Sequence, residues 1–344
     1  MSHESHPRLS TPVFSTLLLP WPARRNPFAR PYARAAADLM CGVGLVTDEP
    51  GDRGMARLKG IVVLDPYVYP YASLDRLVVA GAFSQWLFFL DDQYDDHPEL
   101  GRSPLEVRRI MDRTFETLAT GRLPPSPTPF ARFAVYLRRR LEASCPAGWM
   151  PRFLRNVEAY LFEGSLRTAE YWAQDRVPST SEYLTIRMHD SAVFPAIDMI
   201  EVAAGLHLPR EVLEDPAIAE MRRLTVRHTA YVNDLFSYQK EVLRSGTPCN
   251  LVHVLMHNES VRFDEAVREI VGMVNRDVQR FVELEGSLPR FEPAIADEVD
   301  AYLAGMKDWM RGNVEFSLES KRYRAPDSPF IELGELGDAI AAAA

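Results

Sequence analysis

The stretch LVVAGAFSQWLFFLDDQYDDH, residues 77–97, joins the most apolar run of the chain to its densest group of carboxylates. The apolar part is shorter than the ~20 residues that a membrane span requires, and Ser84 and Gln85 interrupt it. We therefore expect a helix in the core of the protein and no membrane span. The acidic part then lies at the carboxyl end of a buried helix.

Four aspartates, Asp91, Asp92, Asp95 and Asp96, fall within six positions and repel one another unless cations hold them. Asp91 and Asp95 are four residues apart and share one helix face. Acidic groups at a helix carboxyl end also oppose the helix dipole. Oxygen ligands without cysteine suit Mg²⁺. A solvated acidic helix end is the alternative, but the preceding apolar run favours the mouth of an apolar cavity.

A second candidate ligand set lies in TAYVNDLFSYQKE, residues 229–241. Asn233, Ser237 and Glu241 are spaced by four residues, so on an α-helix they fall within ~80° of one face. An amide oxygen, a hydroxyl and a carboxylate in a row can chelate a hard divalent cation. Lys240 borders this row, which suits a bound anion such as diphosphate. The alternative is an ordinary polar helix face, although Asn and Ser are mediocre helix formers.

The rest of the chain predicts an all-α fold with roughly ten or more helices. Apolar residues recur with helical spacing in 105–118, 130–141 and 263–284, and proline and glycine clusters separate such segments. Residues 60–70, GIVVLDPYVYP, are the only fair candidate for a strand, weakened by their prolines. The proline-rich residues 1–35 predict an extended arm.

Composition excludes several other classes of protein. The 344 residues carry a formal net charge of −9, which argues against a general nucleic-acid binder. Cys41, Cys145 and Cys249 are far apart and form no CxxC pair, so neither a zinc site nor a disulfide framework is expected. Buried thiols in a reducing cytoplasm are the simplest interpretation.

Together, the DDxxD-type segment and the downstream NDxxSxxKE segment resemble those of the bacterial class I terpene synthases. The resemblance covers roughly residues 12–325. It implies a single-domain helical bundle around a central apolar active-site cavity, with a catalytic domain at 36–325 between the N-terminal arm (1–35) and a C-terminal tail (326–344). It also implies three Mg²⁺ ions, or Mn²⁺ in their place, that bind the substrate diphosphate.

The resemblance assigns roles residue by residue. Asp91 becomes the principal ligand of two ions, and Asn233, Ser237 and Glu241 chelate the third. Whether Asp95 or Asp96 also binds metal stays open. In relatives, the aspartate corresponding to Asp92 tends to bond the arginine that senses the diphosphate.

Other positions match further family features. Arg187, 46 residues before Asn233, resembles the diphosphate-sensing arginine. Asp190 matches the linker position, and Ser191 occupies the effector position, where many relatives carry glycine. The pair Arg322-Tyr323 resembles the family's Arg-Tyr pair that donates hydrogen bonds to diphosphate, and Lys240 adds a cation.

Aromatic side chains are expected to line the cavity, since aromatic faces stabilise a passing carbocation. For each of them, ordinary core packing is the alternative. Phe316 stands where a tryptophan is often found in the family. The candidates are Phe83, Trp86, Phe88, Phe89, Phe194, Tyr231, Trp309 and Phe316.

The sequence thus predicts a Mg²⁺-dependent terpene cyclase that ionises a linear isoprenyl diphosphate, with farnesyl diphosphate the favoured substrate and geranylgeranyl diphosphate the alternative. A chain-elongating prenyl transferase would carry two aspartate-rich motifs. A phosphohydrolase built on His189-Asp190 would need further ligands with suitable spacing. A non-catalytic isoprenoid-binding helical protein is the alternative from another class. We expect a cytoplasmic monomer or homodimer without nucleic-acid partners.

Overall fold

The computed structural model describes residues 8–95, 97–289 and 291–334, without the side chains of Tyr94 and Asp95. Within these ranges the regular secondary structure is entirely helical, which confirms the predicted all-α class. Asp96 lies outside the described residues. The elements are η1 Phe14–Thr16, α1 Ala29–Val43, α2 Arg53–Ile61, α3 Leu64–Val68, α4 Leu74–Asp95, α5 Pro98–Gly101, α6 Pro104–Thr120, α7 Pro129–Ser144, α8 Trp149–Ala159, η2 Tyr160–Ser165, α9 Leu166–Ala173, α10 Thr180–Asp190, α11 Val193–Ala204, α12 Arg210–Leu213, α13 Pro216–Tyr238, η3 Gln239–Ser245, α14 Leu251–Glu259, α15 Phe263–Ser287, α16 Pro293–Glu319 and η4 Ile331–Leu333.

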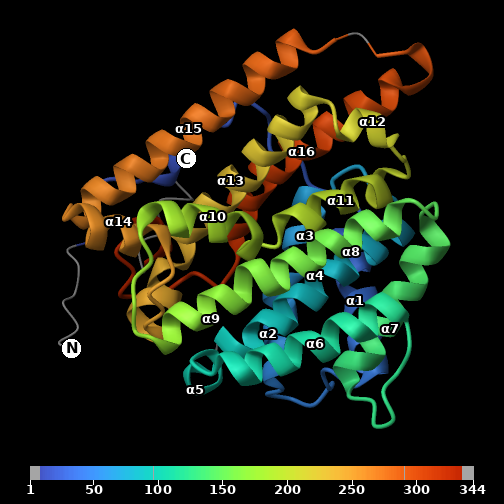
Figure 1. Ribbon diagram of the computed structural model, residues 1–344, viewed down its shortest axis with the longest axis horizontal. Helices are drawn as coiled ribbons and strands as arrows, with labels where there is room; N and C mark the ends of the chain where they lie inside the picture. The colour runs from blue at the N-terminus through green and yellow to red at the C-terminus, as the bar shows by residue number, and fades with distance from the viewer. Residues whose placement is uncertain (1–7, 96, 290, 335–344) are drawn as a thin grey trace.

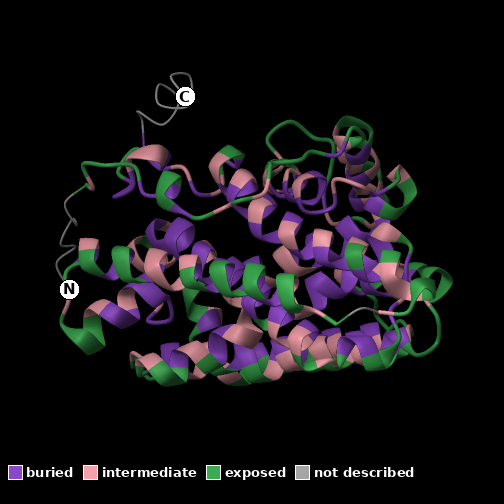
Figure 2. Cartoon of the chain, turned by 90° about the horizontal axis from the view of Figure 1, so that it is seen from above, coloured by how far each residue is buried: buried purple, intermediate pink, exposed green. Residues whose placement is uncertain are grey.

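The apolar run of residues 77–90 forms the inner part of α4, in the middle of the bundle (Figure 1). Helix α4 packs against α1, α7 and α11, and α13 packs against α15 and α16. Leu77, Phe83 and Leu90 have no exposed surface. Buried residues occupy the inward sides of the helices and exposed residues the outward sides (Figure 2). The segment is therefore the predicted core helix, and none of the described helices is long and apolar enough to cross a membrane.

The three segments with helical spacing are helices, as predicted. Residues 105–118 lie in α6, 130–141 in α7 and 263–284 in α15. Residues 60–70, the weak candidate for a strand, are helical, because they form the end of α2 and the whole of α3. Pro66 lies in the first turn of α3, where a backbone N–H has no helical partner to lose.

Two turns of π-helix interrupt the regular geometry beside the cavity described below. The first, η2, joins α8 to α9, and the second, η3, extends α13. Such turns are frequent at functional sites. In η2, a Cβ on Gly164 would lie 2.5 Å from the backbone of Asp190, so only glycine lets α10 approach this closely.

The N-terminal arm packs against the body of the protein, and helix α1 begins at Ala29 within the segment that we expected to be extended. Phe14 stacks on Phe236 of α13, with 3.8 Å between the ring centroids. The backbone N–H of Leu9 donates to the carbonyl of Pro329, 2.9 Å away, in the C-terminal segment. Both terminal segments therefore cover α13 next to the predicted metal-binding row.

Candidate active site

A single hollow gathers most of the predicted site residues. It encloses about 1390 Å³ of empty space, including the space at its open mouth, and is lined by α4, η2, α9, α10, α11, α13, η3, α16 and the segment after α16. The predicted residues that line it are Asp91, Arg187, Asp190, Ser191, Asn233, Lys240, Glu241, Phe88, Trp309, Phe316, Arg322 and Tyr323.

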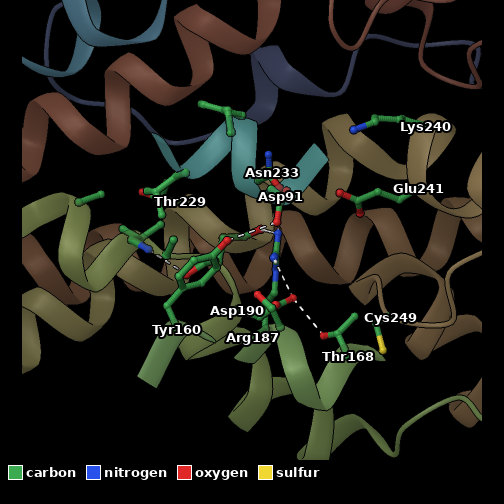
Figure 3. Close-up of a pocket in the computed structure, with 18 of the residues that line it drawn as sticks. Asp91, Tyr160, Thr168, Arg187, Asp190, Thr229, Asn233, Lys240, Glu241 and Cys249 are labelled. Atoms are coloured by element: carbon green, nitrogen blue, oxygen red, sulfur yellow. Dashed lines mark hydrogen bonds and ion pairs between the residues drawn. The ribbon is translucent and has the colours of Figure 1, made fainter. Parts of the chain in front are cut away.

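Asp91 comes from the carboxyl end of α4 and lies beside Asn233, with Glu241 directed toward the same space (Figure 3). Its Oδ1 lies 3.5 Å from the hydroxyl of Tyr160, which donates to it. Burial raises the pKa of Asp91 to about 6, and the neighbouring charge of Asp92 adds to the rise. A carboxylate that is costly to ionise gains from a nearby cation, as expected of a metal ligand.

Asp92 is fully buried and surrounded by cations from three distant parts of the chain. Arg322 Nη2 lies 2.8 Å from its Oδ1, Lys240 Nζ lies 3.3 Å from the same atom, and Arg57 Nε lies 3.0 Å from its Oδ2. Burial acts to raise the pKa of Asp92, but these positive charges outweigh it and hold the pKa at about 2. We name Asp92, Arg57, Lys240 and Arg322 the mouth cluster.

Arg187 does not bond Asp92, which differs from the pattern that the resemblance implies. Its Nη2 lies 2.6 Å from Asp234 Oδ1 and donates to Asn233 Oδ1 at 2.8 Å. Its Nη1 lies 3.7 Å from Asp190 Oδ2. The guanidinium is thus held against α13 beside the predicted ligand row, where it can reach both Asn233 and an anion in the cavity.

The predicted row of Asn233, Ser237 and Glu241 crosses the boundary between α13 and η3. Because the helix widens from Gln239 on, the four-residue spacing of an α-helix holds for Asn233 and Ser237 but not for Glu241. Asn233 Nδ2 donates to the hydroxyl of Tyr323 at 3.0 Å.

The side chains of this row fit a hard divalent cation. The Glu241 carboxylate faces the cavity and accepts a hydrogen bond from Asn250, 3.1 Å away. Ser237 is buried, does not line the hollow, and its Oγ has no partner among the described residues. An orphaned buried hydroxyl between an amide and a carboxylate is what oxygen coordination of Mg²⁺ would satisfy. No group of three His, Cys, Asp or Glu side chains forms a metal cluster in the described part of the chain, and only one member of this row is of those types.

The break between α10 and α11 lies at the predicted effector position. Ser191 ends α10 in the ordinary right-handed region, with φ −66°, and the left-handed conformation falls instead on Ala192, with φ +54°. A serine therefore needs no glycine-like backbone here. Asp190 accepts a hydrogen bond from Thr168 at 3.2 Å, and burial raises its pKa.

Three of the predicted aromatic residues, Phe88, Trp309 and Phe316, line the hollow. The ring centroids of Phe88 and Phe316 lie 6.2 Å apart. The other predicted wall residues are not among the lining side chains. These are Phe83, Trp86, Phe89, Phe194 and Tyr231.

Phe83 and Trp86 are on the other side of α4. Phe83 packs edge-on against Phe153 at 5.0 Å between centroids, and Trp86 stacks on Phe130 at 5.7 Å. Both are completely buried, so they belong to the packed core rather than to the cavity wall.

Several lining residues were missed by sequence reasoning. Thr229 lies four residues before Asn233, and Ser84 seven before Asp91, so helical spacing from a predicted ligand could have found both. Nothing in the local sequence marks the others, because they reach the cavity from separate helices. These are Tyr160, Thr168, Cys249 and Asn313, together with Arg57 of the mouth cluster.

Comparisons with known proteins agree with this arrangement. The family model described as terpene synthase family 2, C-terminal metal binding, matches residues 82–280. The 10-epi-cubebol synthase of Sorangium cellulosum (strain So ce56) is 32% identical over 313 residues, which cover 91% of this chain and 98% of that protein. The (+)-T-muurolol synthase ((2E,6E)-farnesyl diphosphate cyclizing) of Roseiflexus castenholzii (strain DSM 13941 / HLO8) is 27% identical over 313 residues, covering 89% of this chain and 93% of that protein.

Among solved structures, germacradien-4-ol synthase from Streptomyces citricolor is similar, with a TM-score of 0.74, 25% identity, and coverage of 92% of this chain and 99% of that one. The chain therefore belongs to the terpene synthase family and is a lyase that acts on an isoprenyl diphosphate. The matched family domain is a metal-binding one, in agreement with the oxygen-bearing side chains at the cavity mouth.

Proposed function

We propose that this protein is a Mg²⁺-dependent sesquiterpene cyclase that converts farnesyl diphosphate into a cyclic product and releases diphosphate. The observation that carries the proposal is that Asp91, Asn233 and Glu241 face the same space at the mouth of a hollow lined in part by aromatic rings. Farnesyl diphosphate is favoured because a relative that matches nearly the whole chain is named for cyclising it.

The mouth supplies the charge that a departing diphosphate requires. Bound Mg²⁺ would neutralise the leaving group and so lower the barrier to breaking the carbon–oxygen bond. Asp91, Asn233, Ser237 and Glu241 are the proposed ligands. Arg322 and Lys240, which now face Asp92, are near enough to exchange that carboxylate for phosphate oxygens.

Arg187 and Tyr323 complete the proposed diphosphate site. Both bond Asn233 from opposite sides, Arg187 at its amide oxygen and Tyr323 at its amide nitrogen. Metal binding by Asn233 Oδ1 would compete with the arginine, which would then turn toward the anion. The two side chains would thereby couple diphosphate binding to the ligand row.

The hydrocarbon would occupy the apolar part of the hollow. Phe88, Trp309 and Phe316 present aromatic faces there, each able to stabilise a carbocation by about 0.5–2 kcal/mol. These walls would also exclude bulk water until the cation has cyclised. None of this requires a protein nucleophile.

The proposal is tested by incubating the purified protein and Mg²⁺ with geranyl, farnesyl or geranylgeranyl diphosphate separately, followed by gas chromatography–mass spectrometry. We expect cyclic fifteen-carbon products from farnesyl diphosphate, with EDTA abolishing and Mg²⁺ restoring turnover. Products from geranylgeranyl diphosphate alone would identify a diterpene cyclase instead. Turnover indifferent to EDTA would remove the metal mechanism.

We also propose that residues 36–325 form the catalytic unit, that Asp95 or Asp96 adds a metal ligand, and that the protein is a cytoplasmic monomer or homodimer. Light scattering on a size-exclusion column gives the oligomeric state. Alanine variants of the two aspartates, titrated with Mg²⁺, identify which one binds metal. A raised Mg²⁺ requirement is expected for the ligand, and an unchanged one for its neighbour.

A further inference from the structure

Several polar atoms in the cavity lining have no hydrogen-bond partner in the described chain, and one of them is the hydroxyl oxygen of Thr229. Thr229 is on α13, one helical turn before Asn233, and lines the hollow (Figure 3). It is only 4% exposed, and its Oγ1 has no hydrogen-bond partner among the described residues. Buried hydroxyls in proteins are nearly always paired with a protein group or an ordered water.

The preceding turn of the same helix offers a contrast. Thr225, four residues earlier, is also fully buried, but its hydroxyl donates to the carbonyl of Met221 at 2.9 Å, and it does not line the hollow. Threonines within helices commonly satisfy themselves in this way. Thr229 does not, so its hydroxyl stays available to the cavity.

A second polar group lies beside Thr229. Asn313 of α16 lines the hollow, is 5% exposed, and places its Nδ2 3.4 Å from the backbone carbonyl of Thr229. This is longer than the usual 2.7–3.2 Å, so the amide remains able to bond another group. A site for a buried water needs two or more polar partners in a space of adequate size. The hydroxyl and the carboxamide provide them.

Apolar side chains, among them Ala196, Val193 and Leu87, line the same hollow. A water held by Thr229 and Asn313 would therefore face the hydrocarbon and lie about one helical turn from Asn233 at the metal-binding mouth, within reach of the released diphosphate.

We infer that Thr229 and Asn313 hold a water molecule that captures the final carbocation, so that the main product is a cyclic terpene alcohol. This inference rests on the proposed function. The water oxygen donates a lone pair to the cationic carbon and forms the carbon–oxygen bond. One water proton then leaves to the diphosphate released by the same turnover, and a neutral alcohol remains.

The test is the composition of the products made from farnesyl diphosphate and Mg²⁺ in H₂¹⁸O, measured by gas chromatography–mass spectrometry. Wild-type protein should yield a cyclic alcohol that carries ¹⁸O. In Thr229→Val, which keeps the shape but removes the hydroxyl, the ratio of cyclic alcohol to cyclic hydrocarbon should fall about fivefold or more, the loss of one hydrogen bond. Thr229→Ser should restore the ratio, and the matched control Thr225→Val should leave it unchanged.

Other outcomes overturn the inference. Cyclic hydrocarbon as the only wild-type product contradicts the water site but supports the cyclase proposal. Acyclic alcohol as the only product contradicts both, because no ring has formed. An unchanged ratio in Thr229→Val places the water elsewhere. If circular dichroism finds this variant unfolded, Asn313→Leu gives the same readout. No turnover of farnesyl diphosphate by wild-type protein contradicts the proposed function itself.

Discussion

The mouth cluster and a second group of buried charges both pair carboxylates with cations. They differ in the ratio of cations to carboxylates and in their access to the hollow. At the mouth, one described carboxylate, Asp92, faces Arg57, Lys240 and Arg322, which come from α2, η3 and the segment after α16. All three cations keep part of their surface exposed, and the cluster borders the hollow.

The second group lies between α8, α11 and α13 and pairs two carboxylates with two arginines. Asp198 accepts from Arg222 at 2.9 Å and from Asn156 at 2.6 Å, and Arg152 contacts both Asp198 and Glu201. We call Asp198, Glu201, Arg152 and Arg222 the interior cluster. Its carboxylates are fully enclosed, and none of its members lines the hollow.

Buried ion pairs therefore serve two purposes in this protein, stability in the interior and anion binding at the mouth. In the interior cluster, two carboxyl groups and two arginines bond one another away from the hollow, so removing a partner costs stability. At the mouth, three cations share Asp92, so an arriving anion can bind Arg322 and Lys240 while Asp92 stays paired with Arg57. We therefore expect substitutions in the interior cluster to affect unfolding and those at the mouth to affect turnover.

The largest effect is expected for Asp91→Ala, which removes the proposed principal metal ligand. Turnover should fall by at least about 1,000-fold, because charge neutralisation of the leaving group fails. Helicity by circular dichroism and the melting temperature should be nearly unchanged, since burial already disfavours the ionised carboxylate. Asp112→Ala, which removes an exposed helix carboxylate, is the control. Wild-type turnover in Asp91→Ala contradicts the ligand assignment.

Asp198→Ala should be the most destabilising change. It leaves Arg222 and Arg152 without their shared carboxylate, and removing one partner of a buried ion pair costs about 3–5 kcal/mol in the free energy of unfolding. Urea denaturation measures this difference. Arg322→Ala is the matched change at the mouth, and it should cost clearly less because Asp92 keeps Lys240 and Arg57. Equal losses in the free energy of unfolding in the two variants would contradict the proposed difference between the two clusters.

The interior cluster should also make stability depend on pH. Burial raises the pKa of Glu201 from 4.5 to about 7, against the attraction of Arg152. A raised folded-state pKa means that the folded protein holds the proton more tightly, so the stabilisation is complete below pH 4.5 and is lost as pH rises through 7.

Glu201→Gln should remove this dependence, which amounts to about 1–3 kcal/mol in the free energy of unfolding. Urea denaturation of wild-type and variant protein at several pH values between 4.5 and 7 gives, for each protein, the slope of the free energy of unfolding against pH. Parallel slopes would mean that Glu201 does not titrate in this range.

The smallest effect is expected for Ser237→Ala at the mouth. Because the Ser237 hydroxyl has no protein partner in the described chain, its loss should not lower the free energy of unfolding. The Mg²⁺ concentration for half-maximal turnover should rise roughly tenfold, as for one weakened neutral ligand. A drop in stability with an unchanged Mg²⁺ requirement would make Ser237 a structural residue.

Much of the fold could be predicted because local sequence patterns determine where its helices form. The apolar run before Asp91 and the spacing in 263–284 each require a buried helix face, and both are helices in the structure. Residues 60–70 could be read as a weak strand candidate because a short β-branched run interrupted by prolines carries no period of its own. Its helical form is decided by packing of α3 on α16.

The site could be predicted only where the chain carries motifs. Asp91 belongs to the acidic motif that ends the apolar run and Asn233 and Glu241 to the downstream motif, and the structure brings all three to one cavity. Arg57 could not be found, since its meeting with Asp92 depends on how α2 packs against α4. The prediction that Phe83 and Trp86 line the cavity was wrong for a similar reason. The sequence of an all-apolar helix does not reveal which of its faces meets the cavity.

The central claim is that α4 and α13 with η3 hold one metal cluster between them. A crystal structure with Mn²⁺ and diphosphate, and its anomalous difference map, tests this most directly. The account predicts anomalous peaks within bonding distance of Asp91 on one side and of Asn233 and Glu241 on the other, with diphosphate oxygens between. Ordered diphosphate in the hollow without metal at either set of side chains would contradict it.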